Sequence, residues 1–444
     1  MIDPILIAAV LLGIAVLLLL ILYLKIQAFI SLLISSIIVG IVAGMPPLEI
    51  ISTIQKGMAG TLGFVAVVVG LGSIFGAILE QSGGANALAH FMIKTFGEKR
   101  ASWAMVITGF FVAIPVFFDV GFIILVPLVY ALQRKSKKSL LLYALPLLSG
   151  LAITHAFIPP TPGPVAVADI LGADLGLVIL FGGIAGIPAA IVSGPLFAKY
   201  IAEKIHIEAP NEVDTSNVPS ELPSVGHILS IICIPIVLIV IGTLLKSFEG
   251  RLPQLLIESF GMLGHPFSAL IIANLIAWYT LGINKGYTKS QLQDLSTKSL
   301  GPAGIIILLT GAGGVFKQML VDTGTGAMLA TYFAEAGINI FFFAFFAAGI
   351  VRILQGSATV SMITAAGLTA PLLPTTLSDP HKAMLVIVVA AGASLMSHVN
   401  DSGFWLVSKY LGLTEKQTFK SWTVMTSLLG IVGFLTVLLL QLFF

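Results

Sequence analysis

The sequence predicts an all-α polytopic membrane protein, from its composition, its long apolar stretches and the similarity between its two halves. Hydrophobic residues make up 57% of the 444 residues and charged residues only 9%, which is more apolar surface than a water-soluble core can hide. Crossing about 30 Å of hydrocarbon takes roughly 20 apolar residues in a helix, and stretches of this length recur from Ile5 to Phe444. Helices, not barrel strands, are therefore the expected spanning elements.

Eight stretches are apolar throughout and predict spanning helices directly. The first, at 5–24, has no basic region before it and no small-residue cleavage site after it, so we expect a retained helix and not a signal peptide. The others lie at 28–45, 57–80, 177–200, 228–246, 261–282, 301–320 and 422–443. We expect about ten spanning helices, together with two re-entrant hairpins and two interrupted helices.

Four further hydrophobic regions are broken by proline, glycine or polar residues, at 103–133, 140–171, 338–378 and 383–411. None can be one clean helix, because proline removes a backbone donor and glycine loosens the backbone. Basic residues flank 103–133 on both sides, so this region should be a re-entrant hairpin with both ends in the cytoplasm. A second hairpin at 338–378 should enter from the opposite face, and 140–171 and 383–411 should be the interrupted helices.

The two halves of the chain resemble each other. The segment from Gly70 to Phe75 aligns with Gly311 to Phe316, 241 positions later, and Ser149 to His155 aligns in the same way with Gly392 to His398. The predicted topology gives the matched spans opposite orientations, which is the inverted-repeat design of many secondary transporters. We therefore expect an N-terminal repeat at 1–207 with the cytoplasmic-side hairpin, a polar cytoplasmic linker at 208–227, and a C-terminal repeat at 228–444 with the outer-side hairpin.

Several other classes of protein are disfavoured. A net charge of +2 leaves no basic patch for nucleic acid, and the lone Cys233 cannot form an internal disulfide. The sequence has no His-Glu-x-x-His zinc pattern, no Gly-x-Ser-x-Gly elbow and no Gly-x4-Gly-Lys-Ser/Thr phosphate loop. We therefore expect neither an enzyme nor an ATP-driven pump, and a site that needs no metal or cofactor.

The interrupted regions hold nearly all of the intramembrane polar residues, so a substrate should bind between them. Arg352 is the best candidate to neutralise a carboxylate, because its forked donors match the two oxygens. An internal ion pair with Asp119 or Asp401 explains this arginine equally well. Asp119 lies among apolar residues and is the candidate carrier of a coupling proton, although it could instead cap a half-helix.

Matched histidines and the polar residues of the breaks complete the predicted site. His155 and His398 occupy equivalent positions in the two repeats and could donate to substrate or relay protons, or be satisfied interior histidines. Asn400, Asp401 and Ser402 could bind substrate hydroxyls or cap the half-helix that follows, and Asp401 could also carry the coupling ion. Exposed N–H groups at the breaks can bind an anion, which adds the candidates Thr161, Gly163, Gly356, Ser357 and Thr359. Lys317, near the outer end of its span, is expected to snorkel and is not a candidate.

At these interruptions the sequence resembles the gluconate permease family of bacterial proton symporters, within the ion transporter superfamily. The resemblance runs from about Leu24 to the C-terminus. It is most specific at Ser397 to Trp405, at Arg352 with Gly356 to Val360, and at Thr154 to Pro160. The resemblance implies proton-coupled uptake of gluconate or a related small hydroxylated carboxylate, by alternating access across the inner membrane. Homodimerisation is an expectation from the superfamily.

Three positions depart from the family pattern. Thr161 stands where a second histidine is expected, Asp119 where the family carries Glu, and Ala156 where Gly is common. Because these positions lie in the predicted site, glycerate, a ketogluconate or D-serine stays open as the substrate, and sodium stays open as the coupling ion. A passive anion channel is the alternative from another class.

Overall fold

The computed structural model describes residues 3–97, 100–210, 222–246, 248, 250, 253–326, 328, 331, 336–374, 376–399 and 401–444. Within these ranges all regular structure is helical. Eight helices there are long and apolar enough to cross a membrane. The prediction of an all-α polytopic membrane protein is thereby confirmed.

Each half contains one long helix followed by two broken helix pairs. In the first half they are α1 (Pro4–Leu18), α2 (Ala28–Val42), α3 (Pro47–Gln81), α4 (Gly84–Phe96), α5 (Ala101–Val112), α6 (Phe118–Ser136), α7 (Leu141–Phe157), α8 (Pro162–Leu171), α9 (Leu175–Ile191) and α10 (Phe197–Lys204). In the second half they are α11 (Val225–Lys246), α12 (Gln254–Leu263), α13 (Pro266–Ala277), α14 (Lys289–Asp322), α16 (Ile340–Gln355), α17 (Ala358–Thr369), α18 (Asp379–Ala393), α19 (Ser402–Leu411), α20 (Glu415–Thr418) and α21 (Val424–Leu440). The long helices α3 and α14 thus occupy corresponding positions, each before the two broken helix pairs of its half.

Each of the four irregular regions is a pair of helices joined by a short break, as predicted. The pairs are α5–α6 and α16–α17, expected as hairpins, and α7–α8 and α18–α19, expected as interrupted helices. In the α5–α6 pair the break contains Pro115, whose carbonyl oxygen lies so close to α3 that a Cβ on Gly76 would be 1.9 Å away. Only glycine at position 76 therefore allows this tip to reach α3. Entry of the two hairpins from opposite membrane faces stays a prediction.

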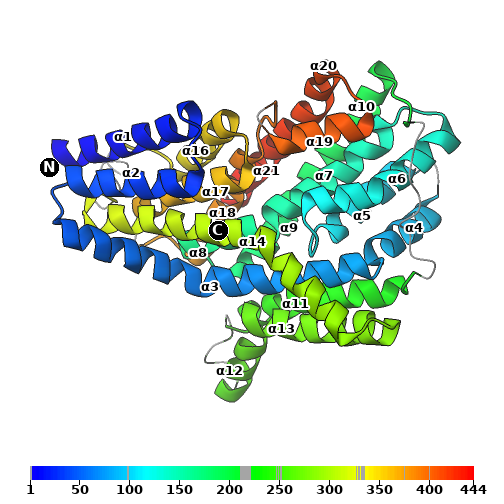
Figure 1. Cartoon of the computed structure of the whole chain (residues 1–444), viewed down its shortest axis with the longest axis horizontal. Helices are drawn as coiled ribbons and strands as arrows, with labels where there is room; N and C mark the ends of the chain where they lie inside the picture. The colour runs from blue at the N-terminus through cyan, green and yellow to red at the C-terminus, as the bar shows by residue number, and fades with distance from the viewer. Residues whose placement is uncertain are drawn as a thin grey trace.

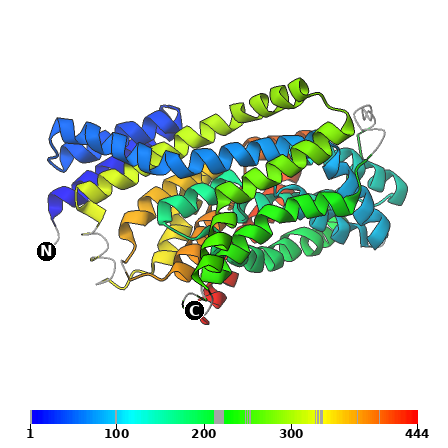
Figure 2. The ribbon, with the colours of Figure 1, turned by 90° about the horizontal axis from the view of Figure 1, so that it is seen from below.

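The two longest helices form the axis of the molecule. Figure 1 shows α3 and α14 side by side along its long direction, and the view from below in Figure 2 agrees. They run in opposite directions, as an inverted repeat requires. The α5–α6 pair lies toward one end of this axis and the α16–α17 pair toward the other (Figure 1). The division at 1–207, 208–227 and 228–444 stays a prediction, and most of the linker lies outside the described residues.

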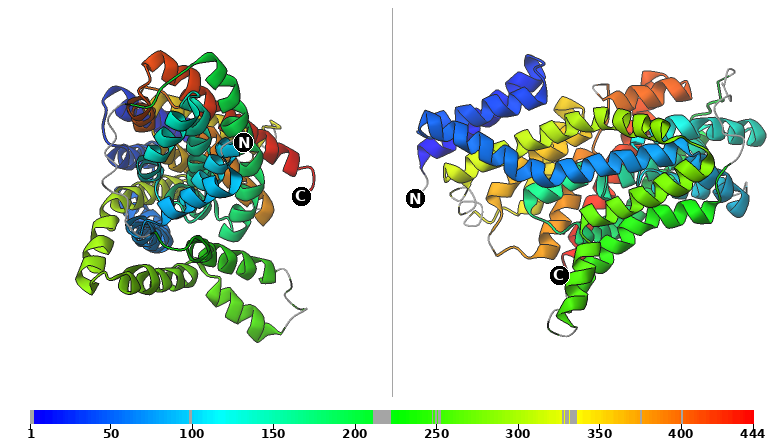
Figure 3. Two further views of the ribbon diagram at one scale, coloured as in Figure 1. Left: turned by 90° about the vertical axis from the view of Figure 1, so that its right-hand side faces the viewer. Right: turned by 60° about the horizontal axis from the view of Figure 1, so that its bottom comes forward.

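Three helices of the interrupted pairs, α7, α8 and α18, are the most buried elements. In the Leu141–Leu171 segment, which contains α7 and α8, 83% of the residues in the most apolar 18-residue stretch are buried. In the segments of α1 and α11 the corresponding share is 33%. Every residue of α18 from Ala383 to Ala393 is buried as well. By contrast, α12 and α13 lie at the periphery, where α12 extends away from the other helices (Figure 3). The broken backbone therefore lies inside the protein, where its polar groups can be satisfied.

Three details of the predicted spans were wrong. The spans predicted at 57–80 and 301–320 are parts of the much longer α3 and α14, whose outer turns are too polar to register as apolar stretches. The α4 helix was not predicted, because its 13 residues are interrupted by polar side chains. The span at 261–282 begins inside α12, and the helix is interrupted before α13, which starts at Pro266.

Candidate functional site

A cavity of about 700 Å³ lies where the tips of both hairpins meet the two interrupted helices. The first half contributes the start of α6 and the end of α7, and the second half contributes the α16–α17 break, the start of α19, and parts of α14 and α21. The lining residues are Phe117, Phe118, Asp119, Val120, Ala152, His155, Ala156, Pro302, Ile306, Arg352, Gln355, Gly356, Ser357, Ala358, Thr359, Ser394, Asp401, Ser402, Gly403, Trp422, Thr426 and Leu429. Neither half alone could form this site.

Three helices begin at the cavity, namely α6, α17 and α19. The α16–α17 break is built by Gly356, which ends α16 with a positive φ of 91°, and by Ser357, whose hydroxyl accepts the N–H of Val360 at 3.3 Å. The first N–H groups of a helix have no partner within it, and its N-terminal end carries a partial positive charge. Three such ends around one cavity favour negative charge there. The protein supplies it at α6 with Asp119 and at α19 with Asp401, and the start of α17 has no carboxylate in its first turn.

Arg352 forms the internal ion pair that the sequence left open, and its partner is Asp401. The guanidinium Nη2 lies 2.5 Å from Oδ2 of Asp401, and Nη1 donates to the carbonyl of Gly356. Asp401 also accepts from the Ser397 hydroxyl and from the N–H of Gly403, and through the second bond it caps α19. The side chains of Arg352 and Asp401 are only 5% and 12% exposed. Their pairing therefore joins the second hairpin to the second helix break.

Asp119 remains uncommitted. Its carboxylate lines the cavity from the first turn of α6 and has no hydrogen-bond or ion-pair partner in the described part of the chain. It is the one lining acid that is not engaged by the protein itself, since Asp401 is paired. The arrangement leaves Asp119 free to exchange a proton with a ligand or with water in the cavity.

The two matched histidines occupy different environments. His155 lines the cavity near the end of α7, and its buried Nδ1 has no partner among the described residues. His398 does not line the cavity. Its Nε2 lies 2.8 Å from the carbonyl oxygen of Ile353 in α16. The predicted role in substrate or proton handling thus has geometric support at His155 and not at His398.

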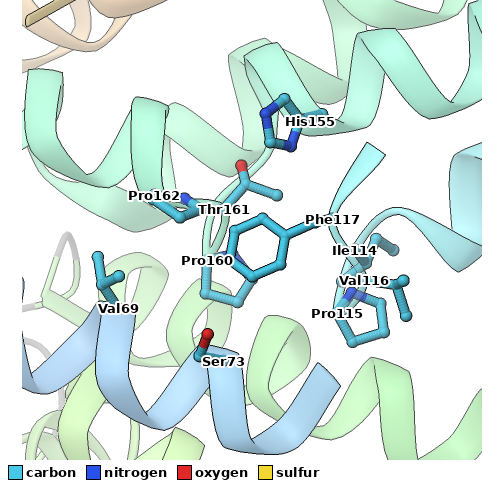
Figure 4. Close-up of a pocket in the computed structure, with 11 residues that line it drawn as sticks. Val69, Ser73, Ile114, Pro115, Val116, Phe117, His155, Pro160, Thr161 and Pro162 are labelled. Carbon is cyan, nitrogen blue, oxygen red and sulfur yellow. The ribbon is translucent and has the colours of Figure 1, made fainter. Parts of the chain in front are cut away.

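Two other candidates, Thr161 and Gly163, do not line this cavity. Thr161 lines a much smaller pocket that it shares with His155, Pro160 and Ser73 (Figure 4). Its hydroxyl is already engaged, donating to the carbonyl of Ile158 at 2.5 Å. Gly163 packs against α17, where an added Cβ would lie 3.0 Å from the sulfur of Met362. Asn400 lies outside the described residues.

The sequence reasoning missed four polar lining residues: Gln355, Ser394, Trp422 and Thr426. The position of Gln355, directly before the glycine of a predicted break, was a signal that could have identified it. Trp422 and Thr426 lie in a span predicted to be a clean helix, so nothing in their surroundings indicated a cavity. Their hydrogen bonds hold the second break in place, with Trp422 donating to Ser397 at 2.6 Å.

Lys317 does not snorkel, contrary to the sequence-based expectation. Its ammonium donates to the carbonyl oxygen of Ile170, near the end of α8, at 2.5 Å. Asp169 in the same turn also interacts with it electrostatically. The last carbonyls of a helix have no partner within it and carry a partial negative charge, so the end of α8 attracts this cation inward.

Comparisons with known proteins agree on one family. A family model described as GntP family permease matches residues 5–443. The chain is 40% identical over 425 residues to the low-affinity gluconate transporter of Escherichia coli, covering 94% of this chain and 95% of that protein. It is 38% identical over 433 residues to the Gnt-II system L-idonate transporter of the same organism, covering 96% and 97% of the two chains.

A solved structure is similar in fold. The crystal structure of the Alcanivorax borkumensis YdaH transporter superposes with a TM-score of 0.64 at 13% identity, over 98% of this chain and 99% of that one. At this identity the likeness concerns the fold alone. It extends over both halves of the chain.

Proposed function

The chain belongs to the GntP permease family and is thus a multi-pass membrane permease and not an enzyme, and we propose that it carries gluconate or a related small hydroxylated carboxylate. In bacteria its place is the inner membrane. We further propose that transport is coupled to protons and proceeds by alternating access. The observation that carries this proposal is the cavity between the hairpins and helix breaks, with three helix N-termini and one uncommitted acid.

The substrate class is supported by the relatives and by the lining. One relative is named for gluconate and another for L-idonate, and both compounds are six-carbon acids with a hydroxyl on every carbon except the carboxyl. The lining supplies hydroxyls at Ser357, Thr359 and Ser402 and an imidazole at His155, which suit a ligand rich in hydroxyl groups. Of the three departures from the family pattern, Asp119 and Ala156 line the cavity and Thr161 does not.

The carboxylate of the substrate should bind at the start of α17. There the N–H groups of Ala358 and Thr359 occupy the first turn, where helical geometry gives them no backbone acceptor. The Arg352 guanidinium lines the same cavity and adds positive charge, although its Nη2 is directed to Asp401 and its Nη1 to the Gly356 carbonyl. In this proposal Arg352 attracts the anion mainly through its field and holds the hairpin tip in position.

Proton coupling is supported by the charges of the cavity. The described lining residues include one cation, Arg352, and two carboxylates, Asp119 and Asp401. A substrate carboxylate would be the third negative charge in a site of low dielectric, where unbalanced charge is costly. A proton on Asp119 returns the net charge of the lining and substrate to its value in the empty site, so the substrate anion and one proton should bind together.

Uptake by the purified protein in proteoliposomes tests this proposal. With an inward proton gradient and no sodium, we expect labelled gluconate to accumulate above its external concentration. Uptake that requires sodium and ignores pH would contradict proton coupling. Equilibration without accumulation would indicate a passive anion channel instead.

The variant Asp119→Asn tests the assigned carrier of the proton. It should lose gradient-driven accumulation and retain exchange of internal for external gluconate, because exchange needs no net proton movement. Asp119→Glu is the matched control, since it keeps a carboxyl group at this position and should keep accumulation. Gradient-driven accumulation by Asp119→Asn would assign the proton to another group.

A further inference from the structure

The polar side chains of the cavity fall into two groups. Most are engaged by the protein: Arg352 and Asp401 pair with each other, Ser394 donates to the Ala390 carbonyl at 2.8 Å, and Thr426 donates to the Thr423 carbonyl at 3.0 Å. A ligand therefore meets mainly the groups without such partners. Gln355 belongs to this second group through the NH2 group of its amide, whereas its amide oxygen is engaged by the protein.

Gln355 is the last residue of α16 and lines the cavity. Its Oε1 accepts the backbone N–H of Ser357 at 3.1 Å. A backbone N–H requires an acceptor, so this bond fixes which end of the amide is oxygen and which is nitrogen. The Nε2 group, with two N–H donors, has no hydrogen-bond partner among the described residues.

The same bond places the amide beside the proposed carboxylate position. Ser357 is the N-cap of α17, so the group that accepts its N–H lies at the start of that helix. In a carboxylate bound to the first N–H groups of α17, C2 is bonded directly to the carboxyl carbon and so is the substrate carbon next nearest to the start of the helix, where this amide lies. The substituent on C2 is then the first group of the substrate that the Nε2 donors meet.

We propose that Gln355 is a specificity-determining residue that donates a hydrogen bond to the oxygen on C2 of the substrate, an inference that rests on the proposed function. An N–H group can donate to a 2-hydroxyl or to a 2-keto oxygen equally well, because both oxygens have lone pairs that accept a hydrogen bond. It disfavours a 2-ammonium group, which has only donors, and gains nothing from a 2-deoxy carbon. The residue thus selects 2-hydroxy and 2-keto acids and excludes amino acids such as D-serine.

The wild-type protein provides the first test, through competition with labelled gluconate uptake. We expect 2-deoxygluconate and the 2-amino analogue to compete on the order of tenfold more weakly than gluconate, and 2-ketogluconate to compete comparably, from the loss of one neutral hydrogen bond. Equal competition by gluconate and 2-deoxygluconate would overturn the role of Gln355 alone. Failure of the wild type to bind or transport any gluconate-type acid would overturn the proposed function together with it.

Gln355→Met provides the second test, because it keeps the length of the side chain and removes both donors. We expect its preference for gluconate over 2-deoxygluconate to fall to near one. If Gln355 instead bound the carboxylate, both acids would weaken equally and the preference would persist, which would overturn the proposal. Should uptake be too weak to measure, binding of the two acids to the detergent-solubilised variant, followed by thermal shift, gives the same ratio.

Gln291→Met is the matched control. Its Oε1 likewise accepts a backbone N–H, that of Thr288 at 2.9 Å, but at the exposed start of α14 and away from the cavity lining. It therefore loses the same kind of local bond without altering the site. Its preference for gluconate over 2-deoxygluconate should match the wild type, and a fall in that preference would show that the loss in Gln355→Met does not come from the cavity.

Discussion

Arg352 and Asp401 act as one unit in the site. Their charges are almost completely removed from solvent and satisfy each other together with Gly356, Ser397 and Gly403. Removing one member of a buried pair leaves an uncompensated charge, which costs about 3–5 kcal/mol of stability. The pair therefore helps to hold the second hairpin in position at the cavity.

A double-mutant cycle separates these contributions. Arg352→Ala and Asp401→Ala should each abolish uptake and lower the thermal unfolding midpoint, since each leaves a buried charge unpaired. The double variant should unfold at a higher temperature than either single variant, because no charge is then left unpaired, and should still fail to transport. If the loss of stability in the double variant equals the sum of the losses in the two single variants, the residues are not coupled. Normal uptake by Arg352→Ala would refute its role in the site.

Lys317 links α14 to the end of α8 through the Ile170 carbonyl and the charge of Asp169. Lys317→Met should lower the unfolding midpoint, because a buried acceptor and a carboxylate lose their partner, at a cost of about 1–3 kcal/mol. Lys56→Met is the control, since Lys56 is 64% exposed and its ion pair with Asp322 lies at the surface, where such pairs contribute little. If the Lys317 side chain instead extended to the membrane surface, the two variants would lower the unfolding midpoint by similarly small amounts.

For single residues, the sequence predicts which side chains line the cavity better than it predicts which side chains contact each other. Charged and polar side chains inside apolar, broken regions are rare, so Asp119, His155, Arg352 and Asp401 were predictable as site residues and all four line the cavity. Whether Arg352 pairs with Asp119 or Asp401 depends on how the second hairpin packs against the second break. That choice involves residues far apart in the chain, and local pattern contains no information about it.

The helix breaks place these residues. Each hairpin or interrupted helix ends one helix and begins another inside the protein, so that N-terminal ends meet at the cavity without leaving the bundle. Proline or glycine marks three of the breaks in the sequence and polar residues mark the one between α18 and α19, which is why all four were predicted. The extent of α3 and α14 and the existence of α4 were not, because polar turns that continue a helix beyond the hydrocarbon leave no apolar signal.

Re-entrant placement of the α5–α6 hairpin can be tested by cysteine labelling. The single native cysteine, Cys233, is replaced by serine, and single cysteines are introduced at Phe96, Ser136 or Ser378. Phe96 and Ser136 flank the hairpin and should react with an impermeant maleimide from the same, cytoplasmic face. Ser378, which precedes α18, should react from the opposite face and serves as the control for sidedness. Labelling of Phe96→Cys and Ser136→Cys from opposite faces would exclude a hairpin.

On the scale of the whole molecule, the cavity is shared between the two halves. The first half supplies the free acid Asp119 and the imidazole of His155, and the second supplies the Arg352–Asp401 pair and the start of α17. The halves meet along α3 and α14, which lie side by side in opposite directions (Figures 1 and 2). A relative movement of the halves would therefore alter access to the cavity while each half keeps its own helix breaks.

The charges of the shared cavity lead to a prediction about energy coupling. If one proton on Asp119 accompanies one substrate monoanion, each transport cycle moves no net charge across the membrane. A pH gradient should then drive accumulation of gluconate in proteoliposomes to the same level with and without a membrane potential set by potassium and valinomycin, since the potential acts only on net charge. Accumulation that rises when the interior is made negative would instead mean more than one proton per anion. In that case a second proton carrier must exist beside Asp119, and His155, the other uncommitted titratable group in the lining, would be the group to replace next.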